Sequence, residues 1–533
     1  MVLTIISITA VLAALLNLEC ELRRSLMMFQ QNSYRSERYR SWLSKSGDTT
    51  SMRRLCGFIV FFLVLTPFCP AKFAAGLIGV YAIVDAVWLM RQKYKKPLAM
   101  TMRARRIMVT ALVISALAGA AAVMLFPGVG YVQGLTVLAE AWLGCFCLSH
   151  MVILLSAWLL SPLERRINRK YYDDAARILA SMPGLRVIGV TGSYGKTTTK
   201  HYLQAILSEQ YETLMTPGSY NTTLGVVRTV REMLKPYHEV FIVEMGAKNI
   251  GDIREICDLV HPRAGIVTAV GPQHLESFKT IENVQATKFE LVDSLPADGL
   301  AVVNNDFARI ADRQVGNVRC IRYAVSHPEG ADYVARDIEY TPAGTRFTVV
   351  RQADGHELRL STRLVGECNI SNILGAVAMA QALGVPDDRI AYAVERLEQV
   401  EHRLSIKRVP GGLTIIDDAF NSNPVGSAMA LDVLSAMTGG KRILITPGMI
   451  ELGSEQFELN REFGAKAASC CDIAIVVGEY NREAILKGLE DGGMPVEAVR
   501  PVASFAEAQA VLRATAAVGD TVLYENDLPD TFK

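Results

Sequence analysis

The chain has almost no excess of charge of either sign. Its 533 residues include 55 Lys and Arg against 54 Asp and Glu, a net charge of +1. Without a basic excess the chain creates no global field for a polyanion, so we expect no nucleic-acid partner. Its ten cysteines have no metal-ligand spacing with a histidine partner, and we interpret them as reduced structural thiols. The sequence also lacks an internal repeat and a low-complexity linker.

Apolar residues are abundant instead, and their excess lies in the first 160 residues. The mean hydropathy of +0.22 is high for a soluble enzyme. Several apolar runs approach the ~20 residues that a helix needs to cross a bilayer. The first run lacks the basic start and clear cleavage site of a signal peptide, so we interpret it as an uncleaved span. The sequence predicts a transmembrane region over 1–160 with about five spans, at 2–18, 55–69, 72–90, 107–126 and 135–160.

Basic residues predict the orientation of these spans. They are concentrated in 19–54, in 91–106 and directly after residue 160, whereas 70–71 and 127–134 carry none. Because basic loops remain on the cytoplasmic side, the N-terminus is expected outside and residues 161–533 inside. The sequence therefore predicts a multi-pass protein of a bacterial-type cytoplasmic membrane with a cytoplasmic catalytic region.

Two alternatives remain open within the apolar region. The short runs 55–69 and 72–90 could form one re-entrant hairpin, which leaves both flanking loops inside. Asp85 and Glu140 lie within apolar runs, where acids are costly and often functional. Each lies near the end of its run, so we favour the interpretation that both only reach the interface.

A glycine-rich segment follows the first apolar strand of the polar region. Residues 191–199 read TGSYGKTTT and come directly after the apolar run 185–190. This order predicts a phosphate-binding loop between a strand and a helix, in which backbone N–H groups and Lys196 meet phosphates and Thr197 holds Mg²⁺. Five residues rather than four separate Gly189 from Gly195, so a glycine-rich turn with a chance lysine is the alternative. The expected ATP contacts are Gly192, Ser193, Gly195, Lys196, Thr197 and Thr198.

The sequence predicts that the polar region forms two α/β lobes, at 161–400 and 401–533. In the first, strands at 240–243, 265–270 and 300–303 alternate with helical stretches, which predicts a parallel sheet. Ligands bind at the carboxyl ends of such strands, where Glu244 and His274 are expected. Residues 318–362 are expected to be β-rich. Expected strands of the second lobe are 413–416, 442–446, 473–477 and 521–524. The predicted fold is a helical membrane region, a P-loop ATPase domain and a Rossmann-like domain.

The polar region resembles the Mur ligases, and within them the D-alanyl-D-alanine-adding branch. The motifs that carry the resemblance occur in the family's order over most of 185–520. They are TGSYGKTTT at 191–199, SYNTTLGV at 219–226, VEMGAKNIGDI at 243–253, QHLESF at 273–278, ATKFE at 286–290, GECNISN at 366–372, HR at 402–403, DDAFNSNP at 417–424 and ELG at 451–453. Residues 1–160 lie outside the resemblance. The family usually has a small domain there that grips a uridine nucleotide.

The resemblance implies ATP and Mg²⁺ as cofactors and a set of catalytic residues. Such a ligase activates a carboxylate as an acyl phosphate, which an amine then attacks. Lys196, His274 and Lys288 are the implied catalytic residues, and Thr197, Glu244, His274 and Lys288 are the implied metal site. Lys288 matches a lysine that the family carbamylates. An ordinary exposed helix lysine is the alternative.

The remaining site residues are also implied by the resemblance. Asn369 and Asn372 match adenine-side contacts, although Cys368 stands where the family commonly has histidine. Arg403 and Asp418 would close over ATP, on phosphate and ribose. These residues could otherwise be a surface arginine and a turn acid.

Asn221 is expected on the acceptor side. Pro447 and Gly448 stand in the segment where the family has Gly-Asp before Met, and the family's Lys-Gly-Ser near the C-terminus is missing. Both departures fall in the lobe that receives the amine.

The resulting hypothesis is a membrane-bound ATP-dependent amide ligase of peptidoglycan precursor synthesis. Its expected partners are ATP, membrane lipid, a muramyl-peptide or lipid-linked acceptor, and a small amine such as D-alanyl-D-alanine. A ligase for another polymer, such as poly-glutamate, is an alternative because the nucleotide-gripping domain is missing. A membrane-anchored nucleotide sensor is a second alternative, although a sensor need not keep Lys196, Glu244, His274 and Lys288.

Overall fold

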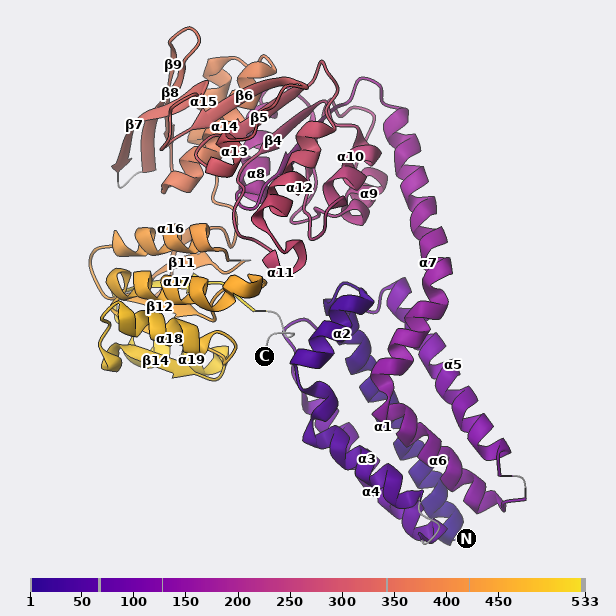
Figure 1. The fold of residues 1–533 in the computed structure, drawn as a ribbon. Coiled ribbons are helices and arrows are strands. Elements are labelled where there is room, and N and C mark those ends of the chain that lie inside the picture. The colour runs from indigo at the N-terminus through magenta and orange to yellow at the C-terminus, as the bar shows by residue number, and fades with distance from the viewer. Residues whose placement is uncertain (1, 66–68, 127, 342–343, 421, 529–533) are drawn as a thin grey trace. The chain divides into compact units, whose positions relative to one another are not determined.

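The computed structural model describes residues 2–65, 69–126, 128–341, 344–420 and 422–528 (Figure 1). The chain divides into two compact units, one formed chiefly by the residues up to Asn168 and the other by Arg169–Asp527. The first unit is helical, and the second is α/β. The long helix α7 (Ser149–Ala180) carries the chain from the first unit into the second and contains Pro162.

The helical unit is built from apolar helices around a shared core. Alanines and leucines of α1, including Ala10, Ala14, Leu18 and Leu22, pack there with residues of the other helices. The remaining elements are α2 (Ser36–Lys45), the 3-10 turn η1 (Asp48–Thr50), α3 (Met52–Val64), α4 (Ala71–Arg91), α5 (Met102–Met124) and α6 (Tyr131–Cys147), after α1 (Val2–Gln31).

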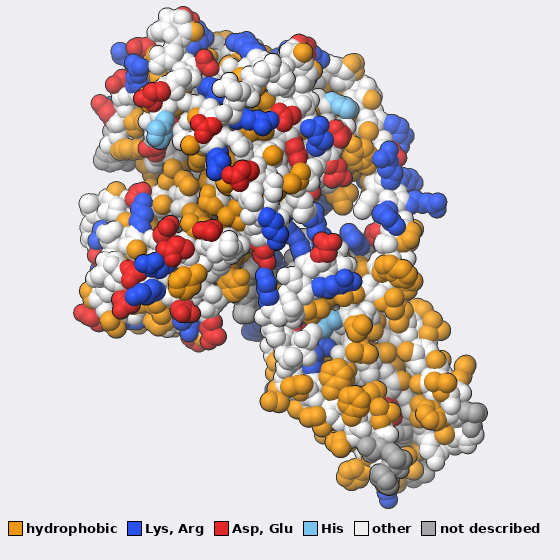
Figure 2. All heavy atoms as spheres, in the orientation of Figure 1, with side chains coloured by type: hydrophobic (Ala, Val, Ile, Leu, Met, Phe, Trp, Pro, Cys, Tyr) orange, Lys and Arg blue, Asp and Glu red, His pale blue; other side chains and the backbone are white. Residues whose placement is uncertain are grey.

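Three described helices are long and apolar enough to cross a membrane: α1, α4 and α5. Helices α6 and α7 meet at a bend of 79° and make a fourth span if counted together. Large apolar side chains remain exposed at helical spacing, among them Val109, Val113 and Leu117 on α5, and Figure 2 shows hydrophobic side chains covering much of this unit. The count of about five spans stays a prediction. Helix α3 has 13 residues, and residues 66–68 of the expected run 55–69 lie outside the described residues.

The expected cytoplasmic loop 19–54 is mostly helical, and part of its charge is buried. Helix α1 continues to Gln31, and Arg54 is 1% exposed. Arg54 contacts Glu21 and donates to the carbonyls of Phe146 and Cys147 at 3.3 and 3.2 Å. These carbonyls end α6, where backbone acceptors lack helical partners. The expected span 135–160 is not one continuous helix, because α6 ends at Cys147 and α7 begins at Ser149; it stays a prediction, since the bent pair can count as one span.

Asp85 is buried within the helical unit, and its place relative to a membrane interface stays a prediction. It is 4% exposed and pairs with Arg53 at 2.9 Å. A buried carboxylate needs such a partner, since an unpaired charge is costly to bury. The Oε1 atom of Glu140 is buried without a hydrogen-bond partner. Asp85 therefore has a charged partner and the Oε1 atom of Glu140 has none among the described residues, although both acids lie near the ends of apolar runs in the sequence.

The first lobe of the second unit contains a nine-stranded sheet in the order β2-β3-β1-β4-β5-β6-β7-β8-β9. Its pairs are parallel from β2 to β7 and antiparallel from β7 to β9. The expected parallel sheet and the expected β-rich segment are both present. The strands are β1 (Arg186–Thr191), β2 (Thr213–Met215), β3 (Val240–Glu244), β4 (Ala264–Val267), β5 (Leu300–Asn304), β6 (Arg319–Ala324), β7 (Tyr333–Thr341), β8 (Gly344–Arg351) and β9 (His356–Thr362).

Helices cover both faces of this sheet because its central strands are apolar on both sides. Strand β3 is buried along its whole length, as expected for a parallel sheet between helices. One core includes residues of α8 (Lys196–Leu207), α14 (Glu367–Ala382) and α15 (Asp387–Glu395). The other includes residues of α9 (Thr223–Glu232), α10 (Asp252–Val260) and α12 (Ile281–Asp293). The lobe also contains the short helices α11 (Leu275–Phe278) and α13 (Ala308–Ala311).

The second lobe has a six-stranded sheet in the order β10-β11-β15-β12-β13-β14, parallel except for β10. Its strands are β10 (Ser405–Arg408), β11 (Thr414–Asp418), β12 (Arg442–Thr446), β13 (Ile473–Val477), β14 (Val499–Val502) and β15 (Thr521–Glu525). Its helices are α16 (Pro424–Ser435), α17 (Gln456–Cys470), α18 (Arg482–Asp491) and α19 (Phe505–Thr515), with 3-10 turns η2 (Gly453–Glu455) and η3 (Val496–Ala498). All four expected strands are present.

Candidate functional site

The loop between β1 and α8 needs glycine at two positions. Gly192 has φ +149° and Gly195 has φ +75°, values that side chains rarely adopt. A Cβ atom at Gly192 would collide with Thr268, and one at Gly195 with Asn372. Ser193 fixes the loop further, since its Oγ donates to the Gly271 carbonyl at 3.0 Å. The loop is therefore fixed in place ahead of the N-terminus of α8, where the first N–H groups of a helix lack partners within it and can meet an anion.

Lys196 begins α8 and turns back over this loop. Its Nζ donates to the carbonyls of Gly192 and Ser193 at 2.6 and 3.0 Å. Burial lowers the pKa of Lys196 to about 8, and the charge of Glu244 opposes that shift. Thr197 and Thr198 follow in the first turn and are 9% and 7% exposed. The lysine, the two threonines and the loop amides thus share one small region.

Glu244 ends β3 and is 1% exposed. Lys200 Nζ lies 2.9 Å from one of its carboxylate oxygens, and Asn221 Nδ2 donates to the other at 3.0 Å. Burial raises the pKa of Glu244, but the charges of Lys200 and Lys196 outweigh that effect and the net shift is downward. Glu244 is therefore an ionised carboxylate at neutral pH.

Lys200 was not selected from the sequence. Its Nζ is also bonded to the Gly218 carbonyl at 2.6 Å, and the residue is fully buried. The available signal was its spacing, because residues four apart in a helix lie on one face and Lys196 was already assigned.

Lys288 lies on α12 and is 1% exposed, so the alternative of an exposed helix lysine is wrong. Among the residues that the structure describes, no hydrogen bond or ion pair of its Nζ is found, and the ring of Phe278 is centred 5.8 Å away. Burial lowers its pKa well below the ordinary value, and the charge of Lys196 lowers it further. The side chain is thereby biased toward a neutral amine.

His274 precedes α11 in a left-handed conformation, with φ 54°. Its Nδ1 is hydrogen-bonded to Glu451, which comes from the second lobe. Burial lowers the pKa of His274, although the bond to Glu451 acts in the opposite direction. Glu451 also pairs with Lys248 at 3.1 Å. The ELG and VEMGAKNIGDI motifs contain Glu451 and Lys248, but sequence reasoning gave neither residue a role.

Asn369 and Asn372 lie on α14, which packs against α8. Asn369 Oδ1 accepts a hydrogen bond from Tyr202 at 2.8 Å, and Asn372 Oδ1 accepts one from Thr199 at 3.0 Å. Both asparagines therefore contact the helix that starts with Lys196.

Arg403 and Asp418 come from the second lobe. Arg403 donates to the Phe420 carbonyl at 2.7 Å and stacks over the Phe420 ring, and Asp418 Oδ1 accepts from the Leu404 amide at 3.0 Å. Burial raises the pKa of Asp418 to about 6. Asn421 of the DDAFNSNP motif lies outside the described residues.

The charged groups selected from the sequence act on one another. The charge of Arg403 lowers the pKa of Lys196, and the charge of Glu244 raises it. Lys196 in turn lowers the pKa of Lys288. His274 is bonded to Glu451, which in turn pairs with Lys248, and the charge of Lys288 lowers the pKa of His274. The site is therefore a basic cluster around one buried carboxylate, beside a histidine held by an acid of the second lobe.

Two α/β lobes with parallel-rich sheets and this cluster define the class of Mur ligase domains. The Mur ligase middle domain matches residues 190–380, and the Mur ligase, glutamate ligase domain matches residues 402–524. The chain belongs to the Mur ligase family, and its relatives from Bacillus subtilis and Escherichia coli carry the name UDP-N-acetylmuramoyl-tripeptide–D-alanyl-D-alanine ligase.

The similarity to these relatives covers part of each protein. The Escherichia coli ligase is 32% identical over 59% of this chain and 69% of its own length. The Bacillus subtilis ligase is 30% identical over 53% of this chain, which spans only 60% of that relative. The crystal structure of MurF from Acinetobacter baumannii has a TM-score of 0.60 at 26% identity and covers 67% of this chain and 77% of its own. The fold of MurF from Thermotoga maritima, solved in complex with ADP, is similar at a TM-score of 0.60, with 24% identity and coverage of 67% and 80%.

Proposed function

We propose that the protein is an ATP- and Mg²⁺-dependent ligase that adds D-alanyl-D-alanine to a muramyl-tripeptide-type acceptor. The observation that carries this proposal is the cluster of the half-buried Lys196 with the buried Glu244 and Lys288 behind a glycine loop and a helix N-terminus. The loop acts as a P-loop for ATP, and the second lobe acts as a Rossmann-like domain that receives the amine. The relatives' names supply the substrates.

Lys196 orients the γ-phosphoryl group in this proposal. It lies among loop carbonyls, and ATP phosphate would replace these acceptors with stronger, charged ones. The amides of Gly192, Ser193 and Gly195 and the hydroxyl of Thr198 would bind the other phosphate oxygens. Phosphoryl transfer needs mainly positioning and charge compensation, which these groups provide.

The residues of the cluster fit a hard cation. Glu244 is an ionised carboxylate, Thr197 offers a hydroxyl, and His274 keeps Nε2 available because Nδ1 is bonded to Glu451. The oxygen atoms of Glu244 and Thr197 are of the kind that Mg²⁺ prefers. When bound, the ion offsets the charge of the transferring phosphoryl group.

Lys288 would complete this set as a carbamate. Its neutral amine can attack CO₂, forming an N–C bond and releasing one proton to water, and the product is an anion. The lowered pKa and burial of Lys288 favour that reaction. The Glu244 carboxylate binds Asn221, which we place at the acceptor. Asn369 and Asn372 would contact adenine, Arg403 phosphate, and Asp418 ribose.

We also propose that helices α1, α4 and α5 place the protein in a bacterial-type cytoplasmic membrane, with residues 161–533 in the cytoplasm. Their exposed apolar side chains, for example Val80 and Val84 on α4, would otherwise be in water. The orientation is supported by the basic segments around them.

A different amine is a second candidate because of Glu525. This residue stands where the family has Lys-Gly-Ser, and its Oε2 is buried without a hydrogen-bond partner. Burial raises its pKa, and so does the charge of Asp418. Glu525 thus differs from the family's lysine in the lobe that receives the amine, so a ligase for another polymer, such as poly-glutamate, is the alternative function.

Mass spectrometry of reaction products tests the proposal. The full chain is incubated with ATP, Mg²⁺, a UDP-muramyl tripeptide and D-alanyl-D-alanine, and separately with glutamate as the amine. We expect ADP and the dipeptide adduct. ATP turnover that does not depend on added acceptor or amine would instead indicate a nucleotide sensor.

A further inference from the structure

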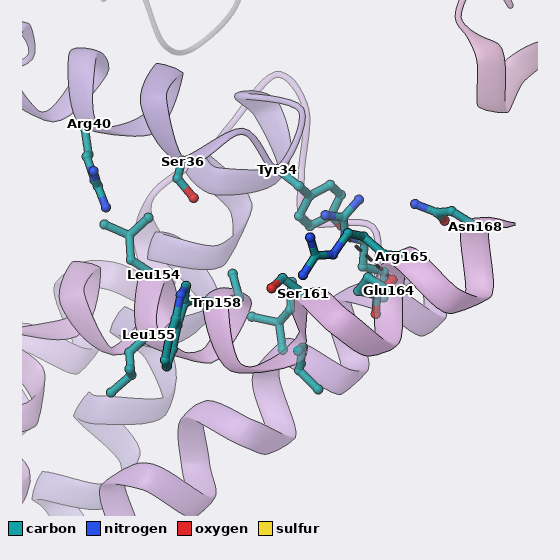
Figure 3. A pocket seen from close by; sticks show the side chains of 14 residues that line it. Tyr34, Ser36, Arg40, Leu154, Leu155, Trp158, Ser161, Glu164, Arg165 and Asn168 are labelled. Carbon is teal, nitrogen blue, oxygen red and sulfur yellow. Dashed lines mark ion pairs between the residues drawn. The ribbon is translucent and has the colours of Figure 1, made fainter. Parts of the chain in front are cut away.

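The helical unit contains a cavity of about 450 Å³ between α2, α5 and α7. One side of its lining is mainly apolar, and the other carries polar and charged side chains. Figure 3 shows Leu154, Leu155 and Trp158 on one side and Tyr34, Arg165 and Glu164 together on the other. Trp158 is 69% exposed and Leu155 is 44% exposed. The pocket is therefore amphipathic, with an apolar side open to the surroundings.

The lining as a whole carries an excess of positive charge, with Arg165 on the polar side and Arg40 beside Leu154 (Figure 3). Arg40, Arg103 and Arg165 line the pocket, and Glu164 is the one acid among the lining residues. Glu164 is already bound by Arg106, which donates to its two oxygens at 2.7 and 3.0 Å. Arg106 is not a lining residue, so the charge of Glu164 is compensated from outside the pocket.

The three lining arginines are poorly compensated. Arg103 stacks over Tyr34 with its guanidinium 4.5 Å from the ring centre. Its Nε lies 3.9 Å from Glu164 and is buried without a hydrogen-bond partner. Arg40 and Arg165 are exposed, and no ion pair of either is found among the residues that the structure describes. The arrangement leaves guanidinium donors available for an anion.

The sequence of helix α7 indicates the depth of the pocket in a membrane. Its residues are apolar up to Leu160 and turn basic from Arg165. Pro162, between them, has no N–H to donate to the preceding turn. If the helices cross a membrane as proposed above, this change from apolar to basic places the pocket at the depth of lipid headgroups.

We propose that this pocket binds the phosphate-bearing headgroup of a membrane lipid. A phosphate on the polar side would contact Arg103 and Arg165, Arg40 would add positive charge from the side of Leu154, and the lipid chain would lie along Leu155 and Trp158. The inference rests on the membrane placement under the proposed function. A polyprenyl phosphate and an anionic diacyl phospholipid share this chemistry. A lipid-linked acceptor would be of the first kind.

Lipid binding to the full chain tests the inference. The protein is purified into zwitterionic phosphatidylcholine nanodiscs, and binding of polyprenyl phosphate, phosphatidylglycerol and inorganic pyrophosphate is measured separately. The pocket variant is Arg40→Gln/Arg165→Gln. The matched control is Arg105→Gln/Arg166→Gln, which removes two exposed arginines from α5 and α7 that do not line the pocket.

We expect the pocket variant to bind the phosphate-bearing lipid about 25-fold more weakly, since each of the two arginines contributes about fivefold. The control should stay within about twofold of the parent. The lipid whose affinity falls more in the pocket variant is the one that the pocket binds. Equal losses in both variants, no preference over phosphatidylcholine, or equally tight binding of free pyrophosphate would overturn the inference.

Ligation of a soluble acceptor is measured on the same samples. We expect the pocket variant to keep the parental rate, which also shows that it has folded. An active parent whose lipid binding does not depend on Arg40 and Arg165 would contradict only the lipid site. A parent without ligase activity would contradict the proposed function instead.

Discussion

Lys196 is bonded to two carbonyls of its own loop, and its positive charge is only partly compensated by Glu244. We predict that Lys196→Ala abolishes ligation and leaves the fold intact. Loss of a charge that stabilises a transferring phosphoryl group commonly costs about 3–4 kcal/mol of barrier, or roughly 10²- to 10³-fold in rate. Steady-state kinetics with ATP measure the effect. Exposed Lys235→Ala is the control, and a parental rate in Lys196→Ala would show that the phosphate site is elsewhere.

Lys288 is buried on α12 with its pKa lowered by burial and by Lys196. We predict that Lys288→Ala is nearly inactive and that a short carboxylic acid partly restores activity, because its oxygens replace those of the carbamate. Removal of CO₂ from the buffer should also slow the parent, and bicarbonate should restore it. An alanine variant with full activity, or a parent insensitive to CO₂, would contradict the carbamate. Lys279→Ala on the adjacent segment is the control.

Asp418 has a raised pKa of about 6, caused by burial. The folded state therefore holds its proton more tightly than the unfolded state, and this contribution to stability is lost as pH rises from about 4 to about 6. We predict that Asp418→Asn stabilises the protein above pH 6 and has little effect at pH 4. Thermal unfolding of the parent and the variant across this range measures the difference. A difference that is constant with pH would contradict the assignment.

At the scale of elements, the site depends on groups carried by both lobes. Arg403 lies beyond the first lobe, yet its charge acts on Lys196. We predict that Arg403→Ala raises the KM for ATP several-fold, because the second lobe completes the ATP site. ATP titrations of ligase rate measure this change. Arg408→Ala, an exposed arginine at the end of β10, is the control; an unchanged KM for Arg403→Ala would remove that residue from the ATP site.

The sequence predicted the larger elements because their patterns are local. Apolar runs such as 240–243 and 473–477 became β3 and β13, and the glycines of 191–199 became the loop before α8. It did not predict β2, β10 and β14, which have three or four residues each and little apolar pattern.

Contacts between distant residues were also missed, for a different reason. The pair Lys200–Glu244 and the contacts of Glu451 with His274 and Lys248 join residues 44 to 203 positions apart. Spacing within one helix or strand carries no information on such pairs. The burial of Arg54 was missed likewise, since its partners Glu21 and Phe146 belong to other helices.

At the scale of the whole molecule, the chain joins a ligase-family α/β unit to a helical unit with exposed apolar surface. The two Mur ligase domains match residues 190–380 and 402–524, so the helical unit lies outside the part of the chain that matches the family. Membrane attachment raises the local concentration of a membrane-bound acceptor and gives no advantage with a freely diffusing one. A unit with this effect changes which acceptor is used rather than the chemistry of the site.

This argument predicts different acceptor preferences for the full chain and for residues 169–533 alone. With a soluble muramyl-peptide acceptor, both should ligate at similar rates, because the α/β unit holds all the proposed catalytic residues. With a lipid-linked acceptor in nanodiscs, the full chain should be faster by about tenfold or more, as expected from the higher effective concentration. Paired product assays on both acceptors measure the ratio of the two rates. An equal ratio for both proteins would reduce the helices to an anchor without a role in choosing the acceptor.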